Sequence, residues 1–171
     1  MQYYLPMKDK INHADKAREL FLAGYNCSQA VLGAFCEELG LDFDTAMKLS
    51  SSFGGGMGRM RLVCGAVSGM FMVSGLRDGF VGNAEVSGSE KAAHYERIQK
   101  LARAFEEKNG SIVCAKLLGL DDKLGKTASD VCEASTAFSP IPEQRTKEYY
   151  KKRPCAELVA MAASILDGEE D

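Results

Sequence analysis

Apolar residues recur at intervals of three and four along most of this 171-residue chain, which is the spacing of amphipathic helices. The first predicted helix begins after Asn12, an N-cap with Asp15 three residues later, and ends at Gly24. No segment shows a convincing alternation of apolar and polar residues with period two, the pattern of a half-buried strand. The pattern therefore predicts an all-α fold, a single-domain bundle of about six to seven helices with a glycine-rich loop.

The remaining predicted helices follow in order along the chain. They cover 27–39, closed by Gly40; a short third helix with Asp44 as its N-cap; Cys64 to about 78; 87 or 89 to 108; 112–118, capped by Ser111; 143–152; and 154–167. We expect one domain over 1–171. Within it, 12–118 is the predicted helical core, 119–142 an irregular insertion, and 154–167 the helix that completes the core.

A glycine-rich loop, SFGGGMGRMR, precedes the helix that Cys64 begins. Glycines can adopt positive φ and let the backbone approach another group closely. Phosphate binding is only weakly indicated, because the loop lacks a Gly-Lys-Ser/Thr ending and no strand precedes it. Gly65 and Gly69 leave a bare stripe on the following helix, which permits close approach of another helix or of a cofactor. The residues that we predict to contact a cofactor are Gly54, Gly55, Gly56, Arg59 and Gly65.

Composition and charge exclude several function classes. The hydrophobic fraction of 46% and charged fraction of 26% are typical of a soluble globular protein, and a net charge of −3 favours neither nucleic acid nor a membrane surface as partner. No apolar run approaches the roughly 20 residues of a membrane span, and the N-terminus has no signal-peptide pattern. We therefore expect a cytoplasmic protein without a nucleic-acid partner. His13 and His94 lie in charged helical surroundings and are expected to be solvated.

Six cysteines are the main compositional anomaly. In a reducing compartment thiols seldom form structural disulfides, which favours metal binding or redox chemistry. Buried, inert core cysteines are the alternative. No CxxC pair is present, and the spacing matches no zinc-ribbon or ferredoxin pattern. Cys36 is expected in the core, and Cys132 is either a resolving thiol on a loop or simply an exposed residue.

Four of the cysteines share a position, because each falls in the first turn of a predicted helix and on its apolar side: Cys27, Cys64, Cys114 and Cys155. The unpaired N–H groups and partial positive charge of a helix N-terminus favour an anion. We therefore expect the pKa of each thiol to be lowered, which yields the thiolate that acts as nucleophile and metal ligand. The four residues are our candidate catalytic residues and metal ligands, gathered at one site, with Arg59 and Arg61 offsetting thiolate charge.

Five segments of the chain occur in the order found in one known family: GYNCSQAVLGAF (24–35), FGGGMGR (53–59), CGAVSG (64–69), GSIVCAKLLG (110–119) and RPCAELV (153–159). With them the chain resembles, from about Gly24 to Leu166, the C_GCAxxG_C_C family of small bacterial and archaeal proteins described as redox-active. The family's four characteristic cysteines correspond to the four named above. The chain is also similar to the cysteine-rich part of split-Soret-type cytochromes, which carries an iron–sulfur centre. It has no CxxCH motif, so haem is not implied.

Three hypotheses for function follow. The first is a redox protein whose four cysteines form a reversible disulfide or ligate a [2Fe–2S]-type iron–sulfur cluster, for electron or thiol transfer with an unknown redox partner. The second is a zinc-binding structural or adaptor protein with the same four ligands. The third is a helical scaffold with inert core cysteines. As an enzyme it would be an oxidoreductase. A second copy of the chain, in a homodimer, is a further candidate partner.

Overall fold

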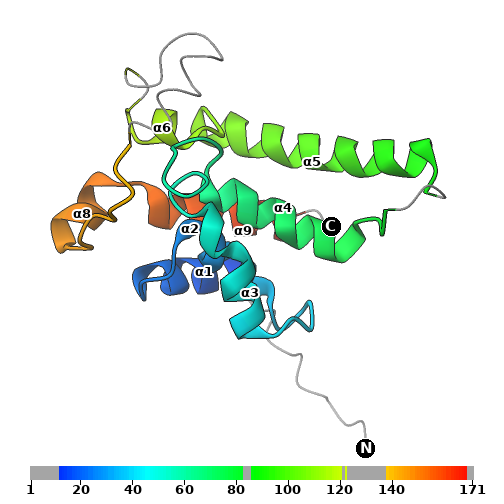
Figure 1. Cartoon of the computed structure of the whole chain (residues 1–171), viewed down its shortest axis with the longest axis horizontal. Coiled ribbons are helices and arrows are strands. Elements are labelled where there is room, and N and C mark those ends of the chain that lie inside the picture. Colours follow the sequence, from blue (N-terminus) through cyan, green and yellow to red (C-terminus); the bar gives the residue numbers. More distant parts are fainter. Residues whose placement is uncertain (1–11, 83–85, 121, 123–137, 169–171) are drawn as a thin grey trace, which may run out of the picture.

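The computed structural model of the chain describes residues 12–82, 86–120, 122 and 138–168. These residues form eight α-helices and one short 3₁₀-helix (Figure 1). In chain order they are α1 (His13–Leu22), α2 (Cys27–Phe35), α3 (Phe43–Ser50), η1 (Ser51–Phe53), α4 (Gly65–Asp78), α5 (Gly88–Asn109), α6 (Cys114–Leu117), α8 (Lys147–Lys152) and α9 (Cys155–Asp167). Among these residues the only β-type pairing is an isolated bridge between Val63 and Val113. The predicted all-α fold is confirmed.

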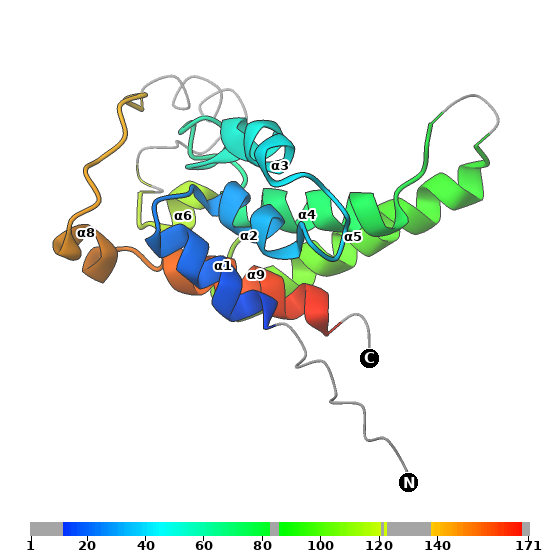
Figure 2. The ribbon, with the colours of Figure 1, turned by 90° about the horizontal axis from the view of Figure 1, so that it is seen from below.

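The bundle is built around the contacts of α2 with α1, α4 and α9. Helix α1 lies antiparallel to α9 (Figure 2), since Arg18 of α1 pairs with Glu157 near the start of α9 and His13 contacts Asp167 at its end. Helix α5 lies against α4 and α9. Its fully buried residues, Leu101 and Phe105, are both in its C-terminal half, and the N-terminal half projects beyond the bundle (Figure 2).

The core lies where these helices meet. Its largest fully buried side chains are contributed by five helices: Phe21, Phe35, Phe105, Leu32, Met70, Leu101 and Leu166. Small residues let the helices approach: a Cβ added at Gly69 of α4 would lie 2.9 Å from the carbonyl oxygen of Ser28 and from Cβ of Val31 on α2. The bare glycine stripe predicted on α4 therefore lies against α2.

Local capping chemistry sets most helix starts. The Asn12 side chain accepts a hydrogen bond from the Asp15 N–H, as predicted. Helix α3 corrects the prediction: its N-cap is Asp42, whose carboxylate accepts from both the N–H and the hydroxyl of Thr45, while Asp44 lies inside the first turn. Asp42 and Asp44 both carry a carboxylate near this helix start, and only Asp42 precedes the Thr45 N–H by the three residues that N-capping requires.

Three predicted helices are shorter than expected. Helix α2 ends at Phe35, because the chain then turns through Gly40 (φ 60°) and the Leu41 N–H bonds back to the Cys36 carbonyl. The expected 112–118 helix is confined to α6, and Ser111 instead accepts from the Val113 N–H before that helix begins. The expected 143–152 helix begins only after Thr146, which caps α8. Most of the expected insertion, and Cys132 with it, lies outside the described residues.

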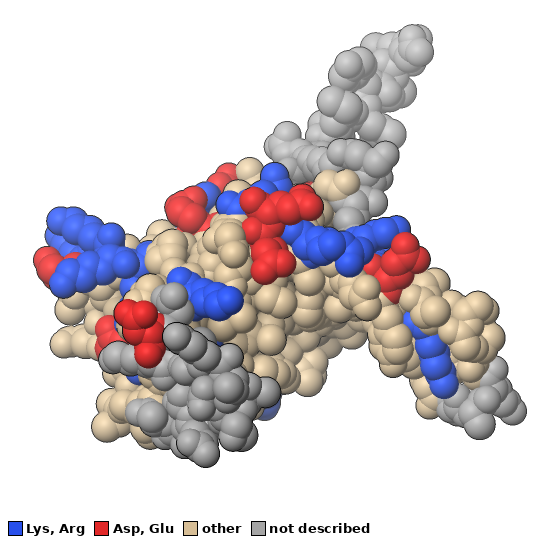
Figure 3. Space-filling view, turned by 90° about the horizontal axis from the view of Figure 1, so that it is seen from above, with Lys and Arg blue, Asp and Glu red and all other residues tan. Residues whose placement is uncertain are grey.

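The surface carries mixed charge. On the face seen in Figure 3, basic and acidic side chains lie in neighbouring groups, and α8 contributes a basic cluster at one end of the molecule. That cluster contains the exposed residues Lys147, Lys151 and Lys152, with Glu148 between them in the sequence. Among the described helices, none combines the length and the apolar character that crossing a membrane requires.

Candidate functional site

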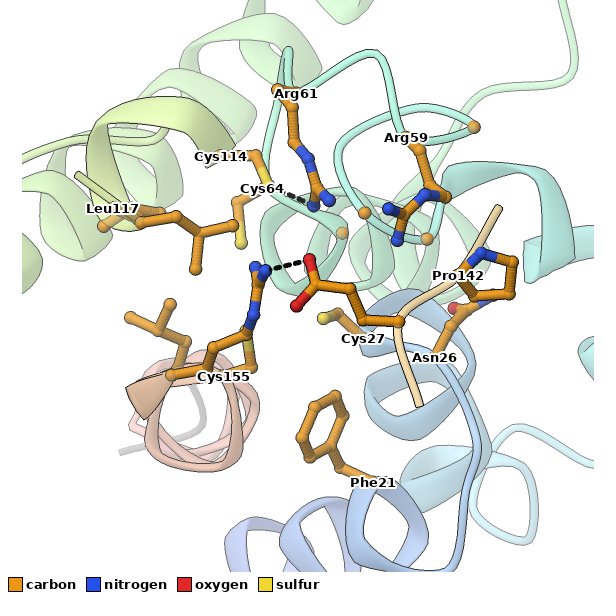
Figure 4. A pocket seen from close by; sticks show the side chains of 18 of the residues that line it. Phe21, Asn26, Cys27, Arg59, Arg61, Cys64, Cys114, Leu117, Pro142 and Cys155 are labelled. Carbon is orange, nitrogen blue, oxygen red and sulfur yellow. Dashed lines mark hydrogen bonds and ion pairs between the residues drawn. The ribbon is translucent and has the colours of Figure 1, made fainter. Parts of the chain in front are cut away.

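A cavity of about 310 Å³ lies where the glycine loop, α2, α6, α9 and the segment before α8 meet. All four predicted cysteines line it (Figure 4). Much of the remaining lining consists of charged and apolar residues: Arg59, Arg61, Arg145, Arg153, Glu143, Phe21, Leu117, Leu118, Leu158, Pro140 and Pro142. The cavity is therefore a thiol pocket surrounded by arginines.

Each cysteine reaches the cavity from the start of a helix. Cys27, Cys114 and Cys155 are the first residues of α2, α6 and α9, and Cys64 is the N-cap of α4. Four helix starts thus converge on one space, as the sequence pattern predicts. Cys36 does not join them: it is 6% exposed in the core, where its thiol donates to the Leu32 carbonyl over 3.5 Å.

The α2 end of the cavity is fixed by hydrogen bonds to the α3–η1 segment. Asn26 caps α2 through the Gln29 N–H, and the Gln29 side chain accepts from the Asn26 N–H, which forms a capping box. The Asn26 amide also donates to the Ser51 carbonyl over 3.0 Å, and the Ser28 hydroxyl donates to the Ser50 carbonyl over 2.7 Å. These contacts hold Cys27 at a fixed place in the wall.

The glycine loop has an unusual backbone. Besides three glycines, three other residues have left-handed φ: Met57 (58°), Arg59 (68°) and Arg61 (63°). Such conformations are strained for residues with a Cβ and persist where the surrounding structure enforces them. The Leu62 N–H bonds to the Gly56 carbonyl and closes the loop over 3.2 Å. The loop thereby directs the Arg59 and Arg61 side chains into the cavity (Figure 4). The sequence predicted both arginines beside the thiols, but it did not predict the left-handed backbone at residues other than glycine.

Backbone pairing joins the glycine loop to the start of α6. The Cys64 N–H donates to the Ile112 carbonyl over 2.8 Å, and the Cys114 N–H donates to the Leu62 carbonyl over 2.6 Å. These two bonds flank the Val63–Val113 bridge. They bring together two cysteines that are 50 positions apart in the sequence.

Two of the predicted glycines are required by close approach to a cysteine. A Cβ at Gly56 (φ 75°) would lie 2.6 Å from Cβ of Cys114, and a Cβ at Gly65 would lie 3.0 Å from Cβ of Cys27. Gly54, Gly55 and Gly65 line the cavity, as does Arg59. Gly56 packs behind Cys114 and is not part of the lining. The predicted role of these five residues in holding a cofactor stays a prediction.

Cys27 and Cys155 form an asymmetric thiol pair. A hydrogen bond from the Cys27 thiol is the largest influence that lowers the pKa of Cys155, to about 7, and the charges of Arg153, Arg61 and Arg145 lower it further against the effect of burial. The same hydrogen bond, followed by burial, raises the pKa of Cys27 well above that of an ordinary thiol. Both shifts favour the negative charge on Cys155 over Cys27.

The other two thiols stay protonated. Burial raises the pKa of Cys64 to about 12 and outweighs the hydrogen bonds from the Ala66 and Val67 N–H groups. Burial also raises the pKa of Cys114, against the lowering effect of Arg61, whose Nη1 lies 3.9 Å from the sulfur. The expectation that all four helix starts lower their thiol pKa is thus wrong for three of them. At Cys64 and Cys114 desolvation of the charged form is the largest influence, and at Cys27 the hydrogen bond with Cys155 is the largest and desolvation the second. Cys155 differs in having three arginines nearby.

The four arginines differ in how many of their N–H groups have a hydrogen-bond or ion-pair partner. Arg145 donates to the Phe21 carbonyl over 2.8 Å and lies 4.6 Å above the Phe21 ring, and Arg153 pairs with Glu143. Arg59 donates through Nε to the Ser139 carbonyl over 3.0 Å. Arg61 is 5% exposed, and its Nε has no hydrogen-bond partner among the described residues. Sequence reasoning missed Arg145, Arg153 and Glu143, although Arg153 stands two residues before Cys155.

The arrangement of the cysteines also shows whether they form a site for a metal ion or an iron–sulfur cluster. Within the described residues, no three or more histidine, cysteine or carboxylate side chains lie close enough together to hold a metal ion. The cysteines there are free thiols. As arranged, the four sulfurs share a cavity without forming a coordination site. The iron–sulfur and zinc assignments of Cys27, Cys64, Cys114 and Cys155 therefore stay predictions.

Comparison with known proteins gives one result. A family model described as "Putative redox-active protein (C_GCAxxG_C_C)" matches residues 25–168, which includes all four cavity cysteines. Neither the curated proteins nor the solved structures gave a match. Because the family model covers most of the chain, the protein is a member of the C_GCAxxG_C_C family.

Proposed function

We propose that this protein performs thiol–disulfide exchange in the cavity, with Cys155 as the nucleophile and Cys27 as the resolving thiol. The observation that carries the proposal is that Cys27 and Cys155 line one cavity with four arginines, and that the charges of Arg153, Arg61 and Arg145 favour the thiolate on Cys155. A thiol with a pKa near the ambient pH is close to the optimum for attack, because it combines a large thiolate fraction with high nucleophilicity.

The reaction proceeds in two exchanges. The Cys155 thiolate attacks one sulfur of a substrate disulfide, whose S–S bond breaks; a mixed disulfide forms and the other sulfur leaves as a thiolate. Cys27 then loses its proton and attacks the Cys155 sulfur, which releases the second substrate thiolate. The substrate gains two electrons and leaves as two thiols, with one proton from Cys27 and one from solvent. The Cys27–Cys155 pair becomes a disulfide, which a dithiol redox partner reduces.

The surrounding residues support both steps. Arg153, Arg61 and Arg145 stabilise the thiolate of Cys155. Cys64 and Cys114 stay neutral and are not nucleophiles near pH 7. Their place in the wall, with Leu117 and Leu158, keeps one side of the cavity apolar, and a low local dielectric strengthens the charge interactions at Cys155.

The proposal is tested by oxidising the anaerobically purified, reduced protein with one equivalent of 4,4′-dithiodipyridine, a neutral disulfide. We expect two thiols to be lost and peptide mapping to show a Cys27–Cys155 disulfide. Cys155→Ser should slow the reaction by about 100-fold or more, and Cys27→Ser should halt at the mixed disulfide. Cys36→Ala, in the core, is the matched control and should react like the unmodified chain.

Other outcomes contradict the proposal. A disulfide that joins a different pair would do so, as would equal reaction of all the cysteines. Stoichiometric iron and sulfide, or zinc, in the protein as purified would favour the four-cysteine metal site instead. Four cysteine substitutions with small, independent effects on stability and none on reactivity would favour inert core thiols.

A further inference from the structure

The charges around the cavity are unbalanced. Four arginines line it, and Glu143 is the one carboxylate among the lining residues. The arginines come from separate parts of the chain: the glycine loop, the segment before α8, and the residue between α8 and α9. A concave, partly apolar space lined with one sign of charge concentrates ligands of the opposite sign. The cavity is therefore suited to an anionic ligand.

Among the described residues, part of the donor capacity of Arg61 is unused. Its side chain is buried and points into the cavity (Figure 4). Nη1 lies 3.9 Å from the Cys114 sulfur, a weak acceptor, and Nε has no partner among the described residues. A buried donor without an acceptor is costly, and charged donors are the costliest. An acceptor that enters the cavity would remove that cost.

Arg59 adds a second positive charge next to Arg61. Its Nε bonds to a neutral carbonyl, that of Ser139. Burial lowers its pKa, and so does the nearby charge of Arg61. Both arginines have left-handed backbone, with φ of 68° and 63°. Strain at two residues that place like charges side by side is typical of a site organised for a ligand.

Glu143 shows which chemical group fits this place. Its carboxylate pairs with Arg153, and the charges of Arg153, Arg59 and Arg61 lower its pKa. The Glu143 side chain is nevertheless 53% exposed, at the mouth of the cavity. It pairs with Arg153 and leaves the Nε of Arg61 without an acceptor among the described residues. A carboxylate that enters more deeply would reach donors that Glu143 does not satisfy.

We propose that the cavity binds a low-molecular-weight disulfide that carries a carboxylate, with Arg61 and Arg59 holding the carboxylate while a sulfur meets Cys155. The proposal rests on the proposed thiol–disulfide exchange. A cavity of about 310 Å³ is at the small end of the range for small-molecule sites. It thus favours a small molecule over a disulfide within a folded protein. A guanidinium is well matched to a carboxylate because it can donate two parallel hydrogen bonds.

The test compares two aromatic disulfides of different charge: the dianionic 5,5′-dithiobis(2-nitrobenzoate) and the neutral 4,4′-dithiodipyridine. The measured quantity is the ratio of their second-order rate constants with Cys155, in a Cys36→Ala, Cys64→Ala, Cys114→Ala, Cys132→Ala background. Because Arg61 also stabilises the thiolate, its loss slows both reagents, and the ratio isolates recognition of the charge. We expect Arg61→Gln to lower the ratio about tenfold and Arg59→Gln about threefold.

Two further variants complete the comparison. Glu143→Gln removes the competing carboxylate and should raise the ratio. Arg103→Gln, on the exposed face of α5, removes the same charge elsewhere and should leave the ratio unchanged. A ratio that neither Arg61→Gln nor Arg59→Gln lowers below that of Arg103→Gln would overturn the proposal. If Arg61→Gln fails to fold, Arg59→Gln and Glu143→Gln still decide the question.

A redox-inert measurement separates this inference from the proposed exchange. Benzoate and benzamide differ in charge and little else, and their binding is followed by backbone amide shifts in NMR. Benzoate should shift the signals of Gly55, Arg59 and Arg61, and benzamide should not. If benzoate binds and Cys155 does not react with disulfides, the proposed thiol–disulfide exchange is wrong and the proposed carboxylate site is supported. If Cys155 reacts and benzoate and benzamide shift the same signals equally, the exchange is supported and the carboxylate site is wrong.

Discussion

The two ends of the α1–α9 helix pair hold buried polar groups in opposite ways. At one end, His13 of α1 lies with Nδ1 2.7 Å from the Asp167 carboxylate and Nε2 3.4 Å from that of Glu38. The His13 ring stacks on Phe35 at 4.0 Å, and the Nε of Arg77 donates to Glu38 over 2.8 Å. Each polar group faces a partner of opposite or complementary character. This end is a structural clamp between α1, α9 and the turn after α2.

The cavity end is about 18 Å away, the rise of the 12 residues from Cys155 to Asp167. There, three non-glycine residues have left-handed backbone, and the Nε of Arg61 is unsatisfied among the described residues. One of the thiols, Cys155, has a pKa lowered by the Cys27 thiol and by nearby arginines. Stable interiors pair their buried polar groups, so an unpaired and strained cluster calls for a functional explanation. The contrast distinguishes the paired charges around His13, which stabilise the fold, from the charges around the cavity, for which we propose a chemical role.

His13→Ala should have the largest effect on stability. It removes a buried ring and leaves Asp167 and Glu38 without their shared partner, at an expected cost of about 3 kcal/mol in the free energy of unfolding. The reaction at Cys155 should keep its rate constant, because the change lies at the other end of α9. Urea unfolding measures the first quantity and the dithiodipyridine reaction the second. Arg18→Ala, which breaks an exposed pair with Glu157, is the control and should cost less than about 1 kcal/mol.

Gly56→Ala should come next in size. Its Cβ would lie 2.6 Å from Cβ of Cys114 and 3.0 Å from the Arg61 backbone, at a φ of 75°. Overpacking together with left-handed strain predicts a loss of about 2–3 kcal/mol. Gly40→Ala, at a φ of 60° with no neighbouring atom within 4 Å, isolates the strain and should cost about 1 kcal/mol. Equal losses in the two variants would mean that the loop is not packed tightly against Cys114.

Cys27→Ala should shift the pH dependence of Cys155. Alkylation requires the thiolate, so its rate rises with pH through the pKa, and the midpoint in the unmodified chain is expected near 7. Removing the hydrogen bond that contributes most to the lowering should move the midpoint up toward the 8.5 or so of an ordinary thiol. Cys27→Ser keeps a donor and should move it less. A midpoint that is the same in all three proteins would rule out the asymmetric pair. Iodoacetamide labelling of Cys155, read by mass spectrometry, provides the profile.

The smallest effect concerns the strained backbone alone. Met57→Gly should be more stable than Met57→Ala by about 1 kcal/mol, because both lose the side chain and only glycine adopts a φ of 58° without strain. At Leu49, an exposed position in α3, the order should be reversed by a similar amount. Thermal unfolding of the four variants tests the reversal. The same order at both positions would show that the loop holds no such strain.

Much of the fold is readable from local chemistry. The Asn12 cap, the ends near Gly24 and Gly110, and the start of α5 after Ser87 follow from side chains that contact their own backbone within a few residues. The predicted cap Asp44 was wrong by two residues, because Asp42 also places a carboxylate near the start of α3 and is the N-cap in the structure. His13 was expected in solvent; it is 8% exposed, because its neighbours in the sequence give no hint of Phe35 and Asp167. Local patterns thus predict elements better than their environments.

The sequence by itself determined that four cysteines begin helices on their apolar sides, which was enough to predict that they share a site. Only the tertiary structure decided that Cys27 pairs with Cys155, that Arg61 is buried beside Cys114, and that Arg153 and Glu143 close the mouth. The physical reason is the distance along the chain over which each effect acts. A helix start is set by nearby backbone donors, whereas a thiol pKa depends on burial and on charges that reach it from distant parts of the chain. Burial has the largest effect on the pKa of Cys64 and Cys114, whereas the pKa values of Cys27 and Cys155 depend most on their mutual hydrogen bond, and arginines lower that of Cys155 further.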